Sequence, residues 1–160
     1  MAGIYLKFGD VKGDATEDGH KDWIQCNSCQ WGVGRGIATP VGNAKTRDVS
    51  HPSVSEVVLT KELDSSSVGL FQAAVGAMDA VKVKIDFVRT DKNKAEVYLT
   101  YELENALVSG YSVSSGGDKP NESLSLNFTK ITLNHQAGNV KNDAASKAVA
   151  GYDLALAKTQ

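Results

Sequence analysis

The stretch VKVKIDFVRTDKNKAEVYLTYELE, residues 81–104, decides the fold class of this chain. Apolar and polar residues alternate on both sides of a polar segment at residues 91–94. This period of two is typical of a strand with one buried face, and two such runs around a short polar turn predict a β-hairpin. The second run is expected to turn four residues toward the core: Val97, Leu99, Tyr101 and Leu103.

Similar alternation predicts strands on both sides of this hairpin. The strand-like runs are residues 4–8, 23–33, 56–61, 108–115 and 124–133, and the run at 23–33 has no uniformly apolar face. In the last run the apolar positions change from even numbers, such as Phe128, to odd numbers, such as Ile131. One extra residue restores the apolar face, so a β-bulge or sharp bend is expected near Thr129. The polar, Ala-rich residues 138–151 are expected to be flexible.

One helix and one long loop complete the predicted architecture. Residues 64–67 offer N-cap side chains for a helix at about 65–78. Its apolar stripe is expected to contain Phe71, Ala74, Val75 and Met78. Residues 36–55 lack periodicity, and loops of this length usually contact a partner or are disordered. The elements together predict a mainly β fold of antiparallel strands, as a closed or nearly closed barrel or a two-sheet sandwich, with one helix.

Length, charge and hydropathy exclude several classes of protein. The 160 residues, 17.0 kDa in mass, suit a single domain spanning residues 1–160. A net charge of −2 provides no basic surface, so no nucleic acid partner is expected. No apolar run approaches the roughly 18 residues that a membrane span needs, and no membrane insertion is expected. The first seven residues lack the features of a cleaved signal peptide.

Cys26 and Cys29 are the only residues whose spacing resembles a redox or metal motif. Residues three apart on a strand point to opposite faces, which disfavours a shared metal ion or a disulfide between them. The three histidines, His20, His51 and His135, are scattered singly along the chain. Two ordinary packed cysteines are the favoured interpretation, and redox chemistry is the alternative. No catalytic residue, metal or cofactor is predicted.

The charged residues of the hairpin have a structural interpretation as well. Glu102 and Glu104 fall on its outward face, near Lys82 and Lys84 of the preceding strand. Opposite charges on adjacent strands are typical of a solvated sheet face or a boundary between subunits. We therefore expect paired charges here rather than an acid–base pair.

Several short segments, taken in their order along nearly the whole chain, resemble segments of one protein family. They are IYLKFGDVKG at 4–13, WG at 31–32, VLTKELD at 58–64, LVSGYS at 107–112, ESLSLNFTKI at 122–131 and GYDL at 151–154. Each segment is short, but the ordered set resembles the Hcp family, whose members form the tube of bacterial type VI secretion systems.

The resemblance implies an antiparallel β-barrel of two sheets with one flanking α-helix, assembling as a hexameric ring. Rings of the family stack into a hollow tube inside a contractile sheath, and the tube carries a VgrG spike at its tip. Small effector proteins travel in the lumen. The implied role is structural rather than enzymatic, and the implied partners are further copies of the chain, VgrG, sheath proteins and effectors. The protein would be made in the bacterial cytoplasm and then secreted without a cleaved signal peptide.

The resemblance also suggests where the assembly contacts lie. The long loop would reach toward the adjacent ring, with candidate stacking contacts at Arg35, Thr39, Val41, Arg47 and His51. The turn at residues 9–13 would lie at the ring rim, with Asp10, Val11 and Lys12 as candidates.

The lumen is assigned on polarity, because a channel that passes varied cargo should not trap it through apolar contacts. Ser28 and Gln30 are the candidates for lumen-facing groups, and solvent or a neighbouring subunit is the alternative environment for both. The alternative function is a monomeric small-ligand-binding β-barrel.

Overall fold

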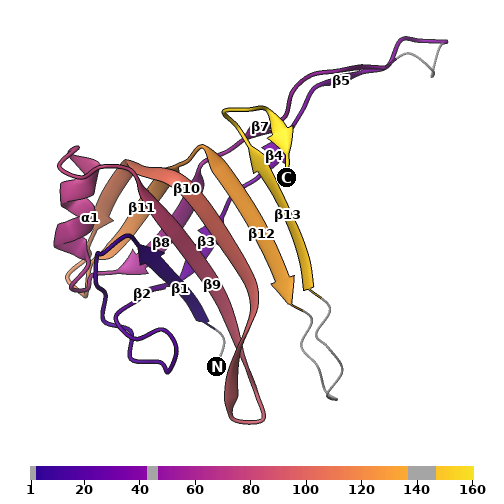
Figure 1. The fold of residues 1–160 in the computed structure, drawn as a ribbon. Helices are drawn as coiled ribbons and strands as arrows, with labels where there is room; N and C mark the ends of the chain where they lie inside the picture. The colour runs from indigo at the N-terminus through magenta and orange to yellow at the C-terminus, as the bar shows by residue number, and fades with distance from the viewer. Residues whose placement is uncertain (1–2, 43–46, 137–146) are drawn as a thin grey trace.

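Two antiparallel sheets and one short helix make up the body of the protein, and a two-stranded arm projects from it (Figure 1). The computed structural model describes residues 3–42, 47–136 and 147–160. The helix in these ranges is α1 (Ser67–Ala74). The strands are β1 (Gly3–Phe8), β2 (Ile24–Cys26), β3 (Ser28–Gln30), β4 (Val33–Gly34), β5 (Ile37–Ala38), β6 (Asp48–Val49), β7 (Ser53–Val54), β8 (Val57–Glu62), β9 (Val81–Asp91), β10 (Lys94–Ser114), β11 (Asn121–Asn127), β12 (Lys130–Gln136), β13 (Lys147–Asp153) and β14 (Lys158–Thr159).

The predicted hairpin is formed by β9 and β10. Its turn residues Lys92 and Asn93 both have positive φ angles, 46° and 64°. Positive φ at both central positions is the geometry of a tight turn that matches the twist of the flanking strands. The two strands pair in antiparallel register from the turn as far as Ala106 opposite Val81.

The long strand β10 belongs to both sheets. Sheet A has the strand order β2-β1-β9-β10-β12-β13-β14, and sheet B has the order β10-β11-β8-β3. The first half of β10 pairs with β9 and β12, and its second half pairs with β11. Asn105, with φ 51°, marks the change of sheet. The two antiparallel sheets with one helix confirm the predicted fold, although the pairing described here stays open between β2 and β3.

The bend predicted near Thr129 is present. The chain leaves β11 at Asn127 and resumes pairing as β12 at Lys130, opposite the irregularity in β10. The Thr129 amide donates to the Glu104 carbonyl at 3.0 Å across this gap. Phe128 and Ile131 are both buried, so the extra residue does restore the apolar face.

The second predicted strand is divided into β2 and β3 at Asn27. Ile24 and Cys26 of β2 are buried, whereas Cys29 on β3 is half-buried and Ser28 is exposed. The inward face therefore changes from even to odd positions at Asn27. This change explains why neither face of the segment is uniformly apolar in the sequence.

The core fills the space between the two sheets and under the helix. Its fully buried side chains come from both sheets and from α1: Leu6, Ile24, Leu59, Leu70, Ile85, Leu124 and Leu126. Burial at this level contributes on the order of 1.5–3 kcal/mol for each Leu or Ile side chain. Within the described residues, the helix is too short and insufficiently apolar to cross a membrane.

The helix is shorter than predicted, and its predicted apolar stripe is only half correct: Ala74 and Met78 are half-buried against the core, but Phe71 and Val75 are not. Gly76 adopts φ 84°, a conformation that favours glycine and that ends the helix after Ala74. Leu70 and Ala73 face the core, whereas Phe71 and Val75 are 55% and 63% exposed. The orientation is set where Val11 packs on Gly69, since a Cβ added at Gly69 would lie 3.0 Å from Val11 Cγ1.

Candidate assembly surfaces

The outward face of sheet B carries small polar side chains and almost no charge. Ser28 on β3 lies opposite Thr60 on β8, and the two hydroxyls are hydrogen-bonded. Thr60 lies opposite Ser123 on β11, which in turn lies opposite Ser112 on β10. One row of four hydroxyl side chains therefore crosses all four strands of the sheet.

The next row of the same face passes through Gln30. It runs from Gln30 to Val58, Ser125 and Gly110. Ser28 and Gln30 are both exposed, as the sequence-based assignment requires. The other hydroxyl residues were not identified as candidates because the pairing of β3, β8, β10 and β11 is not visible in one sequence. The alternating serines of SLS at 123–125 are the signal that could have identified this face.

The long stretch predicted as an irregular loop is a two-stranded arm. Its root is the pair β4–β7, and its outer part is the pair β5–β6. Figure 1 shows the arm projecting well beyond the two sheets. The Ser55 amide donates to the Gly32 carbonyl at 2.8 Å, and the Ser50 amide donates to the Gly36 carbonyl at 3.0 Å. Backbone hydrogen bonds between its own two strands therefore hold the arm together.

The predicted stacking residues all lie on this arm and are all exposed: Arg35, Thr39, Val41, Arg47 and His51. The apolar side chains of the arm are exposed as well, with Ile37 at 50% and Val49 at 45%. A two-stranded hairpin alone is at best marginally stable in water. An arm with open strand edges and exposed apolar side chains is suited to contact with another chain.

The turn predicted at the rim is tight, and only part of it is exposed. The Val11 amide donates to the Phe8 carbonyl at 3.0 Å, and Gly9 has φ 51°. Asp10 and Lys12 project into solvent. Val11 instead packs on the helix at Gly69, so its contact is internal to the subunit.

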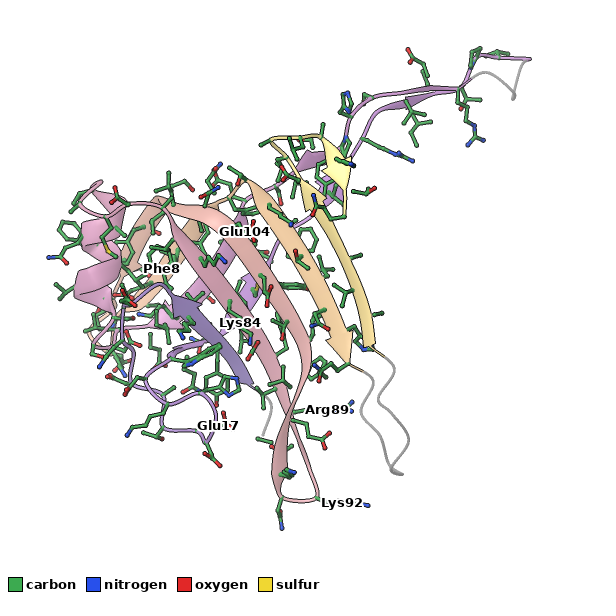
Figure 2. All side chains as sticks on the ribbon, in the orientation of Figure 1. Phe8, Glu17, Lys84, Arg89, Lys92 and Glu104 are labelled. Carbon is green, nitrogen blue, oxygen red and sulfur yellow. The ribbon has the colours of Figure 1, made fainter. Side chains whose placement is uncertain are left out.

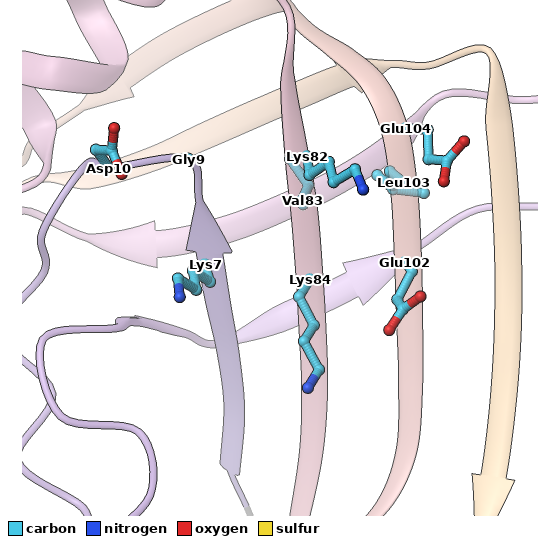
Figure 3. A pocket seen from close by; sticks show the side chains of 9 residues that line it. All are labelled: Lys7, Gly9, Asp10, Lys82, Val83, Lys84, Glu102, Leu103 and Glu104. Atoms are coloured by element: carbon cyan, nitrogen blue, oxygen red, sulfur yellow. The ribbon is translucent and has the colours of Figure 1, made fainter.

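The open face of sheet A is striped with charge. Lys7 lies opposite Lys84, and Lys84 lies opposite Glu102. Figure 2 shows Lys84 and Glu104 on this face, and Figure 3 shows the shallow groove of about 380 Å³ that these side chains line. Although Lys84 and Glu102 are register partners, they form no ion pair among the described residues. The Lys84 ammonium lies 5.9 Å from the centre of the Trp23 ring instead, so the expected pairing of Lys84 with Glu102 is not formed.

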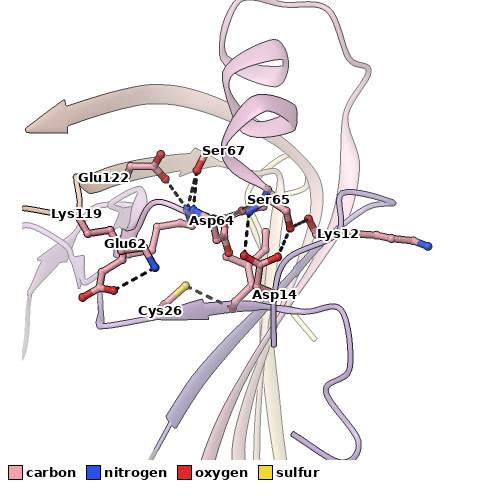
Figure 4. Close-up of polar contacts among 12 residues, drawn as sticks. Lys12, Asp14, Cys26, Glu62, Asp64, Ser65, Ser67, Lys119 and Glu122 are labelled. Atoms are coloured by element: carbon pink, nitrogen blue, oxygen red, sulfur yellow. Dashed lines mark hydrogen bonds and ion pairs between the residues drawn. The ribbon is translucent and has the colours of Figure 1, made fainter. Parts of the chain in front are cut away.

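A buried ion pair supports the helix from below (Figure 4). The Lys61 ammonium contacts Glu122 and lies 3.0 Å from Asp64 Oδ1. Both side chains of the Lys61–Glu122 pair are fully buried. Burial alone would raise the pKa of Glu122, but hydrogen bonds from Lys61 and Tyr111 lower it below its usual value. This cluster fixes the start of α1, because Ser67 also accepts a hydrogen bond from Lys61 at 3.3 Å.

Cys26 lies in the core, and the half-buried Cys29 packs against it. Burial raises the pKa of Cys26 to about 12 and the pKa of Cys29 to about 11. Both thiols are free. Reactive cysteines have lowered pKa values, so these two side chains behave as packed residues. Within the described ranges, no three His, Cys, Asp or Glu side chains form a group that could hold a metal ion.

These features define a class of protein before any comparison is made. The polar face of sheet B, the charged face of sheet A and the projecting arm with its exposed apolar side chains are surfaces suited to contact with other subunits. They are typical of a subunit that assembles with further copies.

Comparison with known proteins identifies the family. The model of the family described as "Type VI secretion system effector, Hcp" matches residues 5–135. The protein Hcp1 of Pseudomonas aeruginosa strain PAO1 is 25% identical over 135 residues, covering 83% of this chain and 82% of the relative. The chain belongs to the Hcp family of type VI secretion systems.

Solved structures agree with this assignment. A type six secretion system protein superposes with a TM-score of 0.89 at 25% identity, with both chains covered completely. The fold also matches Hcp1 from Salmonella typhimurium, with a TM-score of 0.80 at 20% identity and 99% of each chain covered. The match therefore extends over the arm and both sheets as one unit.

Proposed function

We propose that this chain is the tube subunit of a type VI secretion system, and that six copies form a ring whose stacking builds a hollow tube. Family membership supports the tube role. The observation that carries the lumen assignment is the hydroxyl row from Ser28 to Ser112 on sheet B. Such a surface is wetted and lacks the apolar contacts that would hold a passing protein.

The two faces of the body then have different partners. Sheet B lines the lumen, where Ser28 and Gln30 contact small effector proteins. Sheet A forms the outer wall, where the charged side chains around Lys84 and Glu102 face the contractile sheath. A charged outer wall suits a contact that must release when the tube moves, because exposed ion pairs are individually weak.

The arm connects successive rings. Arg35, Thr39, Val41, Arg47 and His51 lie on its exposed surface, and the apolar side chains of the arm become covered when it rests on the next ring. Asp10 and Lys12 lie at the ring rim. The VgrG spike caps the tube, and the protein is secreted from the cytoplasm.

The interior of the body disfavours the alternative of a monomeric ligand-binding barrel. Such a barrel needs an internal cavity, whereas leucine and isoleucine side chains with 0% exposure fill the space between the two sheets. Binding of a small apolar ligand by a stable monomer would contradict the tube role.

The test is the solution mass of the purified protein by light scattering, with negative-stain images of the same fraction. Six copies of 17.0 kDa give a ring of about 102 kDa. Ring-shaped particles of this mass support the proposal. A protein that remains at 17 kDa at high concentration refutes it.

A further inference from the structure

The exposed side of α1 is apolar and carries no charge. Val68, Phe71 and Val75 are 69%, 55% and 63% exposed, and their spacing places them on one stripe. The helix sequence SVGLFQAA contains no charged residue. Exposed helix faces normally carry polar and charged side chains, and a helix that is apolar all round is normally buried. We call Val68, Phe71 and Val75 the helix patch.

The strand β10 extends this apolar area. The rings of Phe71 and Tyr111 meet edge to face, with centroids 6.5 Å apart. Val113, two residues further along β10, is 53% exposed. The helix patch is therefore part of a continuous apolar side of the subunit.

A second incompletely covered apolar surface lies on the inner face of sheet A. One row of this face runs from Ile85 through Tyr101 and Leu133 to Ala150. Ile85 is fully buried, Tyr101 and Leu133 are half-buried, and Ala150 is exposed. The Trp31 ring contacts Tyr101, with centroids 5.6 Å apart, but among the described residues β3, β8 and β11 do not pack extensively over β12 and β13, so burial decreases along the row. We call Tyr101, Leu133, Ala150 and the half-buried Tyr152 the shelf.

The two surfaces lie at opposite ends of the body. Figure 1 shows α1 at one side of the sheets and β12 and β13 at the other. A head-to-tail ring requires two different, complementary surfaces on each copy, placed so that one meets the other on the next copy. We infer that the helix patch of one copy packs on the shelf of the next copy around the ring. This inference rests on the proposed ring, and it specifies which surfaces close it.

Complementary charge substitutions provide the test. Phe71→Glu places a charge in the helix patch, and Ala150→Lys places the opposite charge on the shelf. Both positions are exposed in the single subunit, so both variants are expected to fold. Thr39→Glu and Val149→Lys are the matched controls. Thr39 is exposed on the arm, which takes no part in the inferred contact, and Val149, 58% exposed, lies beside Ala150 on the opposite face of β13.

Light scattering of the full-length variants should give subunits of 17 kDa for Phe71→Glu and for Ala150→Lys, and rings for both controls and for the unmodified chain. An equimolar mixture of Phe71→Glu and Ala150→Lys should recover rings of 102 kDa, six copies of 17.0 kDa. In an alternating ring every contact is either unmodified or charge-matched. Circular dichroism checks that each variant keeps the β-rich fold.

The outcomes separate the inference from the proposed function. If the unmodified chain forms rings and both charged variants also do, the ring proposal stands and this interface is wrong. If the two variants are folded subunits but their mixture forms no ring, the pairing of helix patch with shelf is wrong. If the unmodified chain forms no rings, the ring proposal itself fails.

Discussion

Removing the charge of Lys61 should destabilise the subunit strongly. Lys61→Met keeps an unbranched side chain of similar length but leaves Glu122 without its cation. Both side chains of this pair are fully buried. Breaking a buried pair by removing one partner typically costs about 3–5 kcal/mol, because the remaining charge stays buried and uncompensated. For a chain of this length, that loss corresponds to a decrease in Tm of about 6–20 °C.

Urea unfolding followed by circular dichroism measures this effect. All variants are compared at one fixed protein concentration, because assembly shifts the apparent stability. Lys119→Met is the matched control, since Lys119 makes only an exposed ion pair with Glu62 at 3.6 Å. That change should cost well under about 1 kcal/mol.

The double variant Lys61→Met with Glu122→Leu isolates the cause. Apolar replacement of a whole buried ion pair is often neutral or stabilising, so the double variant should recover much of the stability lost by Lys61→Met. A loss below about 1 kcal/mol for Lys61→Met, or no recovery in the double variant, would refute the view that the buried charge dominates.

The pH dependence of the unmodified protein should show the same pair. The folded-state pKa of Glu122 lies below its ordinary value of 4.5. A carboxyl group of this kind contributes stability above pH 4.5, and the contribution is lost as pH falls through the lowered folded-state value. In Glu122→Gln this acid-dependent contribution should be absent, and equal acid slopes in both proteins would contradict it.

Three further changes test other parts of the structure. His20→Ala should destabilise the subunit by about 1–3 kcal/mol in urea unfolding, because the buried Asp86 carboxylate loses its hydrogen bond with His20 Nε2 at 2.8 Å, whereas His51→Ala on the exposed arm should have little effect. Native Cys26 and Cys29 should resist alkylation at pH 8 and react after denaturation. With a pKa of about 12, the thiolate fraction of Cys26 is roughly a thousandfold smaller than with the ordinary pKa of 9.0. Rapid labelling of the native protein would support a redox role. Deleting residues 39–54 should leave rings of six copies that no longer stack, and tubes of normal length in electron micrographs would count against the role of the arm.

The hairpin, the strand positions and the bend near Thr129 could be predicted because each has a local cause. Alternation marks a half-buried strand, and Lys92 with Asn93 supplies the turn between β9 and β10. The change of apolar phase before Ile131 needs an extra residue wherever the pairing occurs. The segment at residues 138–151 shows the limit of this approach, since residues 147–151 form part of β13 and residues 138–146 lie outside the described ones.

The helix shows why local periodicity cannot identify the buried face. Helical spacing groups Phe71 with Val75 as readily as it groups Leu70 with Ala73. The choice depends on where Val11 meets Gly69, a contact between residues 58 positions apart in the chain. An apolar stripe that lies outside the core of the subunit then becomes evidence of an interface.

The assembly surfaces were predictable only in part. Ser28 and Gln30 were identified from one exposed strand, but the hydroxyl row also needs Thr60, Ser123 and Ser112 in register. Register depends on long-range strand pairing, which a single sequence does not reveal. The arm was recognised by its length and its lack of periodicity, but its two-stranded form rests on pairs such as Ile37 with Val49.

The central claim is that this chain closes into a ring through surfaces at the two ends of its body. Light scattering of Phe71→Glu, of Ala150→Lys and of their equimolar mixture tests it most directly. The account predicts two folded 17 kDa subunits that together form a 102 kDa ring of six 17.0 kDa copies. Rings formed by either variant alone, or a mixture that stays at 17 kDa, would contradict it.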